Sequence, residues 1–169
     1  LRMGFYSRLF DLMYQSPPLA GAAPDPKARS SYLQAIKAMV ETMGEEEAFC
    51  ISSPPGTFFS GVSVMEIKSE AGWKNYIRQG VLDVIPAWKG SAAGKGMTYD
   101  TSGIEKPAKY KDIDVYTLRV RVDPGALSIP PEALKTVGSW MSQTMTVAMA
   151  AVGKIGVSAM SWGGESRIG

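Results

Sequence analysis

The chain has 169 residues, of which 45% are hydrophobic and 20% charged, and its formal net charge is +2. This composition is typical of a folded globular protein and excludes a disordered chain; the near-neutral charge gives no reason to expect a polyanionic partner. The sequence has no histidine and a single cysteine, which excludes an internal disulfide and removes the side chains most used in acid–base catalysis and transition-metal binding.

Apolar side chains recur at helical spacing within residues 1–16, which predicts a short amphipathic helix, and the Pro- and Ala-rich residues 17–26 predict a linker. We expect a single α+β domain over residues 1–169, with its main body in residues 27–169. Because the chain begins with Leu1 and ends in a run that resembles a helix start, we expect it to be a segment of a longer protein.

Two further helices are predicted, each from a capping residue and an apolar stripe. Asp25 followed by Pro26 marks a helix start, and Gly44 is expected to end that helix. Ser69 is expected to cap a second helix that bends near Pro86, because proline cannot continue a regular helix. Its stripe has spacings of three and four: Trp73, Ile77, Val81, Val84 and Trp88.

Alternating apolar residues predict five strands. Residues 46–53 and 58–67 are expected to form an antiparallel hairpin, with Cys50 as a small buried hydrophobic residue. The alternation over 113–122 predicts a half-buried strand with Tyr116, Leu118 and Val120 in the core and its arginines in solvent. A second hairpin is expected around Gly153, with strands near residues 145–151 and 155–159.

The expected fold class is therefore α+β, with a mainly antiparallel sheet of about five strands and two or three helices packed on one face. This order of elements resembles that of secreted bacterial proteins built from antiparallel sheets flanked by helices. The likeness is to a fold alone, because no functional motif accompanies it.

No motif in the sequence predicts catalysis or cofactor binding. The loop Gly90–Gly96 has the wrong glycine spacing for a phosphate-binding loop and lacks the hydroxyl after its lysine. Residues 45–47 are all glutamate, but neighbours on a strand point to opposite faces. Asp100, Asp112 and Asp114 are too few for a calcium site. We expect no catalytic residue, metal or cofactor, and no nucleic-acid partner or membrane span, although an enzyme using carboxylate or lysine chemistry stays an alternative.

The apolar inventory is more suggestive, because the chain has ten methionines and four tryptophans. Methionine fills irregular space and suits adaptable binding surfaces. These residues predict a methionine-rich core. The alternative is a cleft between helix and sheet for an apolar ligand or a partner peptide, with the lining Met65, Trp73, Ile77, Trp88, Met145 and Met149.

The first functional hypothesis is a non-catalytic binding or structural module of a larger bacterial protein, with a periplasmic or secreted location favoured over the cytoplasm. Its partners would be other domains of the parent protein or a separate protein. The alternative is a carrier for an apolar, lipid-like ligand, which would occupy the predicted cleft.

Overall fold

The computed structural model describes residues 30, 34, 37–53, 55, 57, 59–83, 85, 96–126, 132 and 143–163. The predicted helix over 1–16, the linker, the loop at 90–95 and Trp88 lie outside these residues. The described part contains one seven-stranded antiparallel sheet with short helices, so the α+β class is confirmed and the sheet is larger than expected.

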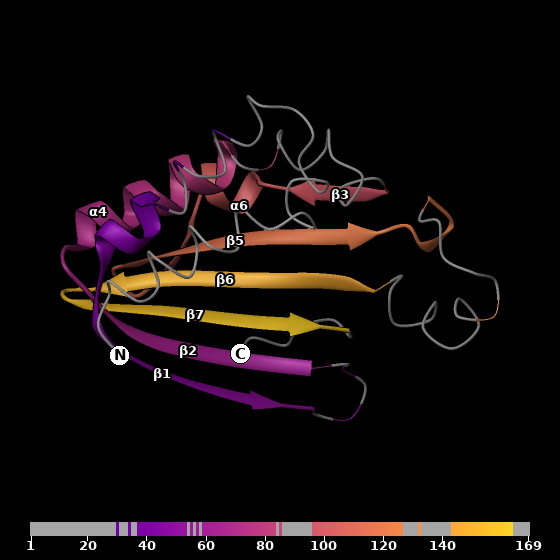
Figure 1. Cartoon of the computed structure of the whole chain (residues 1–169), viewed down its shortest axis with the longest axis horizontal. Helices are drawn as coiled ribbons and strands as arrows, with labels where there is room; N and C mark the ends of the chain where they lie inside the picture. Colours follow the sequence, from indigo (N-terminus) through magenta and orange to yellow (C-terminus); the bar gives the residue numbers. More distant parts are fainter. Residues whose placement is uncertain are drawn as a thin grey trace.

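Six strands follow one another across the sheet in the order β1-β2-β7-β6-β5-β3, and β4 also pairs with β5 (Figure 1). Their bounds are β1 Met43–Ser52, β2 Phe59–Ile67, β3 Met97–Asp100, β4 Ala108–Tyr110, β5 Ile113–Val122, β6 Thr144–Val152 and β7 Ile155–Trp162. Every pairing is antiparallel. Both predicted hairpins, β1–β2 and β6–β7, are confirmed.

The predicted end of the first helix is wrong. Residues 37–42 are helical, but Met43 already begins β1, so Gly44 lies in a strand rather than after a helix. The strand register shifts between Met43 and Glu47. In this bulge the Glu66 carboxylate accepts a hydrogen bond from the Glu45 N–H at 3.0 Å, and a Cβ on Gly44 would collide with the Glu66 side chain. The glycine thus permits a close approach, not a helix end.

Ser69 caps the next helix as predicted. Its hydroxyl accepts a hydrogen bond from the Gly72 N–H at 3.1 Å at the start of α4, Glu70–Asn75. The helix then widens into a π-helical turn, η1, at Tyr76–Gly80, which the spacing of the stripe does not predict. Figure 1 shows α4 and the helical residues that precede β1 at one end of the sheet.

The sheet has two faces, which the register defines. We call the face that carries Tyr116, Leu118 and Val120 of β5 the front face, and the opposite face the back face. The helix α4 packs on the front face, against β6 and β7. The core cluster at this end of the sheet contains Met65, Ile67, Trp73, Ile77, Ile104, Tyr116, Met149 and Ala151.

Three short elements at the β5 edge were not predicted. They are β3, the helix α6 at Ser102–Glu105, and β4, and all lie within residues 97–110. The Asp100 carboxylate starts α6 by accepting hydrogen bonds from the Ser102 N–H and hydroxyl at 3.0 and 2.6 Å. Ile104 of this helix is fully buried, so the segment closes the edge of the core beside β5.

The alternation predicted for β5 is confirmed. Tyr116 and Val120 are buried, Leu118 is half-buried, and Arg119 and Arg121 are exposed on the other face. A two-residue period places alternate side chains on opposite faces, so the correct register follows from the sequence.

Candidate interaction surface

Cys50 is exposed, so its predicted burial is wrong, and the reason is the position of β1 in the sheet. β1 is the last strand on its side of the sheet. All eight residues from Glu45 to Ser52 are exposed, on the front face as well as the back. An edge strand usually buries one face, so this stretch of β1 extends beyond the helical cover of the core.

Large apolar side chains are exposed on both faces at this edge. Phe49 and Ile51 point to the front face and are 73% and 66% exposed. On the back face Cys50 lies beside Val62, and Ala48 lies beside Val64. The two valines of β2 are 43% and 42% exposed. We call these six residues the β1 edge surface: Ala48, Phe49, Cys50, Ile51, Val62 and Val64.

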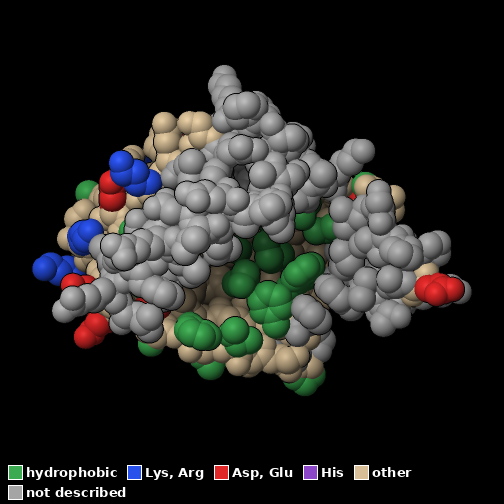
Figure 2. Space-filling view, viewed as in Figure 1, with side chains coloured by type: hydrophobic (Ala, Val, Ile, Leu, Met, Phe, Trp, Pro, Cys, Tyr) green, Lys and Arg blue, Asp and Glu red, His purple; other side chains and the backbone are tan. Residues whose placement is uncertain are grey.

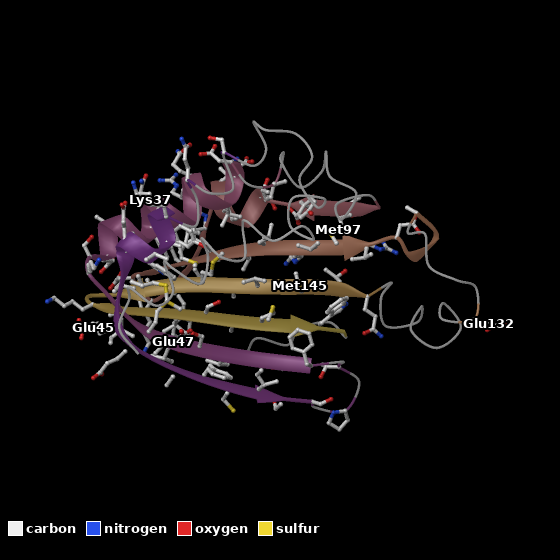
Figure 3. All side chains as sticks on the ribbon, viewed as in Figure 1. Lys37, Glu45, Glu47, Met97, Glu132 and Met145 are labelled. Atoms are coloured by element: carbon white, nitrogen blue, oxygen red, sulfur yellow. The ribbon has the colours of Figure 1, made fainter. Side chains whose placement is uncertain are left out.

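The local sequence explains why β1 keeps this edge. The three glutamates 45–47 precede the apolar run, and Pro54 and Pro55 follow it. Charges and prolines flanking an edge strand limit uncontrolled pairing with other chains. Figure 3 labels Glu45 and Glu47 at the start of the strand, and Glu47 accepts a hydrogen bond from the Ser63 hydroxyl at 2.7 Å. In the sequence, an apolar strand flanked by glutamates on one side and prolines on the other is the pattern that indicates this surface.

A second apolar area lies on the front face next to the core. The register aligns Met160 with Val147, and Trp162 with Met145, on neighbouring strands. Phe59 meets Trp162 edge to face, with ring centroids 6.0 Å apart. We call these five residues the front apolar patch; all except the exposed Met160 are half-buried. Figure 2 shows hydrophobic side chains gathered near the centre of the view.

Four of the six residues predicted to line a cleft meet in the core. Met65, Trp73, Ile77 and Met149 belong to one buried cluster, in which Trp73 is 3% exposed and Ile77 fully buried. Met145 points to the same face further along β6, within the front apolar patch, as Figure 3 shows by its label. Trp88 lies outside the described residues. The cleft prediction itself stays a prediction.

A glycine allows Trp73 to lie close against the sheet. Gly156 of β7 is buried, and a Cβ there would be 3.3 Å from Cε2 of the Trp73 ring and 2.9 Å from Cγ2 of Ile67. The Trp73 ring also contacts Tyr76, with centroids 5.3 Å apart. At this end of the front face the helix and sheet are in direct contact.

The charged groups beside the core form ion pairs rather than a reactive site. Lys74 on α4 contacts Glu70 at 2.7 Å and Asp114 of β5 at 3.3 Å, and Lys109 also pairs with Asp114. The Lys74 hydrogen bond is the main cause of the lowered pKa of Glu70, and the Lys109 hydrogen bond is the main cause of the lowered pKa of Asp114. Its hydrogen bond to Glu70 raises the pKa of Lys74.

These shifts all favour the charged forms. A catalytic carboxylic acid or a nucleophilic lysine needs the opposite shift, towards the neutral form at neutral pH. This cluster therefore has the properties of a link between helix and sheet. Glu70 extends the link, because its carboxylate also accepts a hydrogen bond from the Gly153 N–H in the β6–β7 turn at 3.0 Å.

The aspartates considered for calcium do not converge. Asp100 lies opposite Arg119 on the back face and contacts it at 3.3 Å, whereas Asp114 lies on the front face. Within the described residues no group of three or more cysteine, aspartate or glutamate side chains is arranged to hold a metal ion. Nor does any helix in this part of the chain have the length and apolar character needed to cross a membrane.

The structure also contains a cavity of about 330 Å³ between the helix before β1 and α4. Its lining includes Gln34, Glu41, Asn75 and Asp83.

The chain matches no protein-family model, and neither a curated protein nor a solved structure is significantly similar to it. Its surfaces are therefore the basis for a functional proposal.

Proposed function

We propose that this chain is a non-catalytic binding module that docks a protein partner at the β1 edge surface. The observation that carries this proposal is the exposure of Phe49 and Ile51, at 73% and 66%, on a strand whose outer edge is paired with no other strand of the described residues. Aromatic and aliphatic side chains that stay in solvent beside unpaired backbone groups are the features of strand addition, in which a partner strand extends the sheet.

The side chains beside β1 would allow the module to select among partner strands as well as to bind them. Backbone hydrogen bonds along the edge would hold any extended strand, whereas side-chain fit decides which one. On the front face Ile51 lies next to Gly61 in the register, and Met160 follows on the far side of this glycine. A partner side chain would pack over this glycine, between Ile51 and Met160.

Site-specific photo-crosslinking tests the proposal. A photoreactive phenylalanine analogue replaces Phe49 in the full chain, expressed in its own host, and the matched control carries it at Tyr110, which is 65% exposed on β4 at the other side of the sheet. We expect adducts of discrete mass at Phe49 and none at Tyr110. Absence of adducts at Phe49, or the same adducts at both positions, refutes docking at this edge.

An apolar-ligand carrier is the second candidate, favoured by the front apolar patch. Its half-buried aromatic pair, Phe59 and Trp162, offers an apolar surface beside the closed core. Titration with a long-chain fatty acid should change the tryptophan fluorescence saturably. The response should disappear in Met160→Gln and persist in Val152→Gln, which changes an exposed residue of the back face. Lack of any response in the unmodified chain refutes the carrier.

A further inference from the structure

We infer that the partner at the β1 edge surface is a second copy of this chain, paired through β1 in an antiparallel, two-fold symmetric arrangement. The inference rests on the proposed function and specifies its occupant. Joining two copies in this way would extend the seven-stranded sheet across the two-fold axis. Three features of β1 support this arrangement: its apolar run, its charges and the alternation of its side chains between the two faces.

Charge excludes the parallel arrangement. Glu45, Glu46 and Glu47 occupy the first half of the strand, and all three are exposed. Two parallel copies in register would place each glutamate beside its equivalent, and like charges directly opposite one another destabilise a strand pair. An antiparallel arrangement moves the two acidic stretches to opposite ends of the interface.

Symmetry restricts the antiparallel registers. A two-fold axis perpendicular to the sheet places the front face of one copy beside the front face of the other. Residues directly opposite each other then point to the same face, so the residue of β1 at the axis lies opposite its own equivalent in the other copy. With Ala48 or Phe49 on the axis, Glu47 lies opposite Phe49 or Ile51, which places a carboxylate against an apolar side chain. With Ile51 on the axis, Phe49 would lie opposite Ser53, so its aromatic side chain would have no apolar partner.

The register with Cys50 on the axis avoids these conflicts within the paired residues 48–52. Phe49 then lies opposite Ile51 of the other copy on the front face, and Ala48 lies opposite Ser52 on the back face. Glu47 lies opposite Ser53, just beyond these five positions, and no glutamate lies within them. Aromatic side chains paired with β-branched ones are among the favourable cross-strand pairs.

The same register brings the two Cys50 residues together. Residues directly opposite each other in an antiparallel pair have Cα atoms about 4.5–5.5 Å apart. This separation falls within the range that a disulfide bond requires. Cys50 thus provides a readout of the register, although the pairing does not depend on a covalent bond.

Five paired positions give a smaller contact than the roughly 800 Å² per partner of a standard interface, so the dimer should be a dissociating one. We therefore expect sedimentation equilibrium of the purified full chain under reducing conditions to show concentration-dependent dimerisation. Phe49→Lys should weaken the dimer at least about tenfold, since lysine on an edge strand opposes pairing. Ile155→Lys, at an exposed site in the β6–β7 hairpin, is the matched control and should leave the dimer unchanged.

Mild oxidation with diamide then tests the register. The unmodified chain should form a disulfide-linked dimer rapidly. In a Cys50→Ser background, Ser52→Cys alone should link at least about tenfold more slowly, because residues 52 of the two copies are four positions apart along the strand. Adding Ala48→Cys to that variant should restore rapid linking, since residue 48 lies opposite residue 52.

A monomer at all concentrations, or a dimer that Phe49→Lys leaves intact, overturns the inference. Equal linking rates for Cys50 and for Ser52→Cys overturn the register. Photo-crosslinking at Phe49 distinguishes failure of self-pairing from failure of the docking surface itself. Adducts with a different protein and none with this chain sustain docking at the edge and refute self-pairing, whereas absence of all adducts refutes the docking surface.

Discussion

Replacement of Gly156 by alanine should destabilise the fold, and the structure supplies the magnitude. The added Cβ would lie 2.9 Å from Cγ2 of Ile67, 3.2 Å from Cγ of Met65 and 3.3 Å from Cε2 of Trp73. All three neighbours are buried, so they have little room to move. Insertion of one carbon into such a core costs about 1–3 kcal/mol. Alanine also lowers the conformational entropy of the unfolded chain, which offsets about 0.4–1 kcal/mol of this cost. We expect a net loss of about 1–2 kcal/mol.

Gly61 is a matched control on the same face of the sheet. It lies in β2, and among the described residues a Cβ there would meet only the Cys50 carbonyl oxygen at 3.6 Å and Cγ1 of Ile51 at 3.8 Å. These are ordinary contacts, so Gly61→Ala should be neutral or stabilising by up to about 1 kcal/mol. Urea unfolding followed by tryptophan fluorescence measures both variants. A Gly156→Ala variant as stable as Gly61→Ala would refute the close packing of helix on sheet.

Three further predictions concern the elements around this core. Folding lowers the pKa of Glu70 below 4.5 and the pKa of Asp114 below 3.8. The two carboxylates therefore stabilise the fold fully above these values, and this stabilisation is lost as the pH falls through the pKa values of the folded state. Unfolding midpoints measured from neutral to acid pH should therefore decline less steeply in Lys74→Met than in the unmodified chain, and equal slopes would contradict the ion-pair assignment. Ser69→Ala removes the hydroxyl that caps α4 and should lower the free energy of unfolding by about 1 kcal/mol in a urea titration, while Ser69→Asp should retain most of it. Leu118→Ala should cost less than the roughly 2–5 kcal/mol of a fully buried leucine, because Leu118 is half-buried, and a larger loss in the same titration would show that the exposed part of the front face is covered in solution.

Local sequence predicted those elements whose signals are local. The two-residue period of β5 fixes which of its side chains are buried, and Gly153, with φ of +60°, forms the turn expected between β6 and β7. The Ser69 cap is equally local, because its partner lies three residues away. Such features need no knowledge of the rest of the fold.

Elements that depend on partners far along the chain were missed. β3 has four residues and β4 three, so neither contains enough alternation to stand out, and β5 makes them strands by pairing with them. Gly44 was misassigned because the residue it accommodates, Glu66, lies in the next strand. Burial of Cys50 was expected from its apolar neighbours, whereas its exposure follows from the place of β1 at the edge of the sheet.

The candidate residues were predicted from type and spacing, which identify an apolar face but do not distinguish packed core from open surface. That distinction depends on where α4 lies over the sheet. Gly156 and Gly61 show the difference, because both remove a side chain from the front face. Over Gly156 the Trp73 ring fills the space, and the helix is held against the sheet. Among the described residues, a Cβ at Gly61 would make only ordinary contacts with Cys50 and Ile51. A glycine thus allows close packing of helix on sheet at one end of the face, whereas near β1 a glycine adjoins the surface proposed for docking.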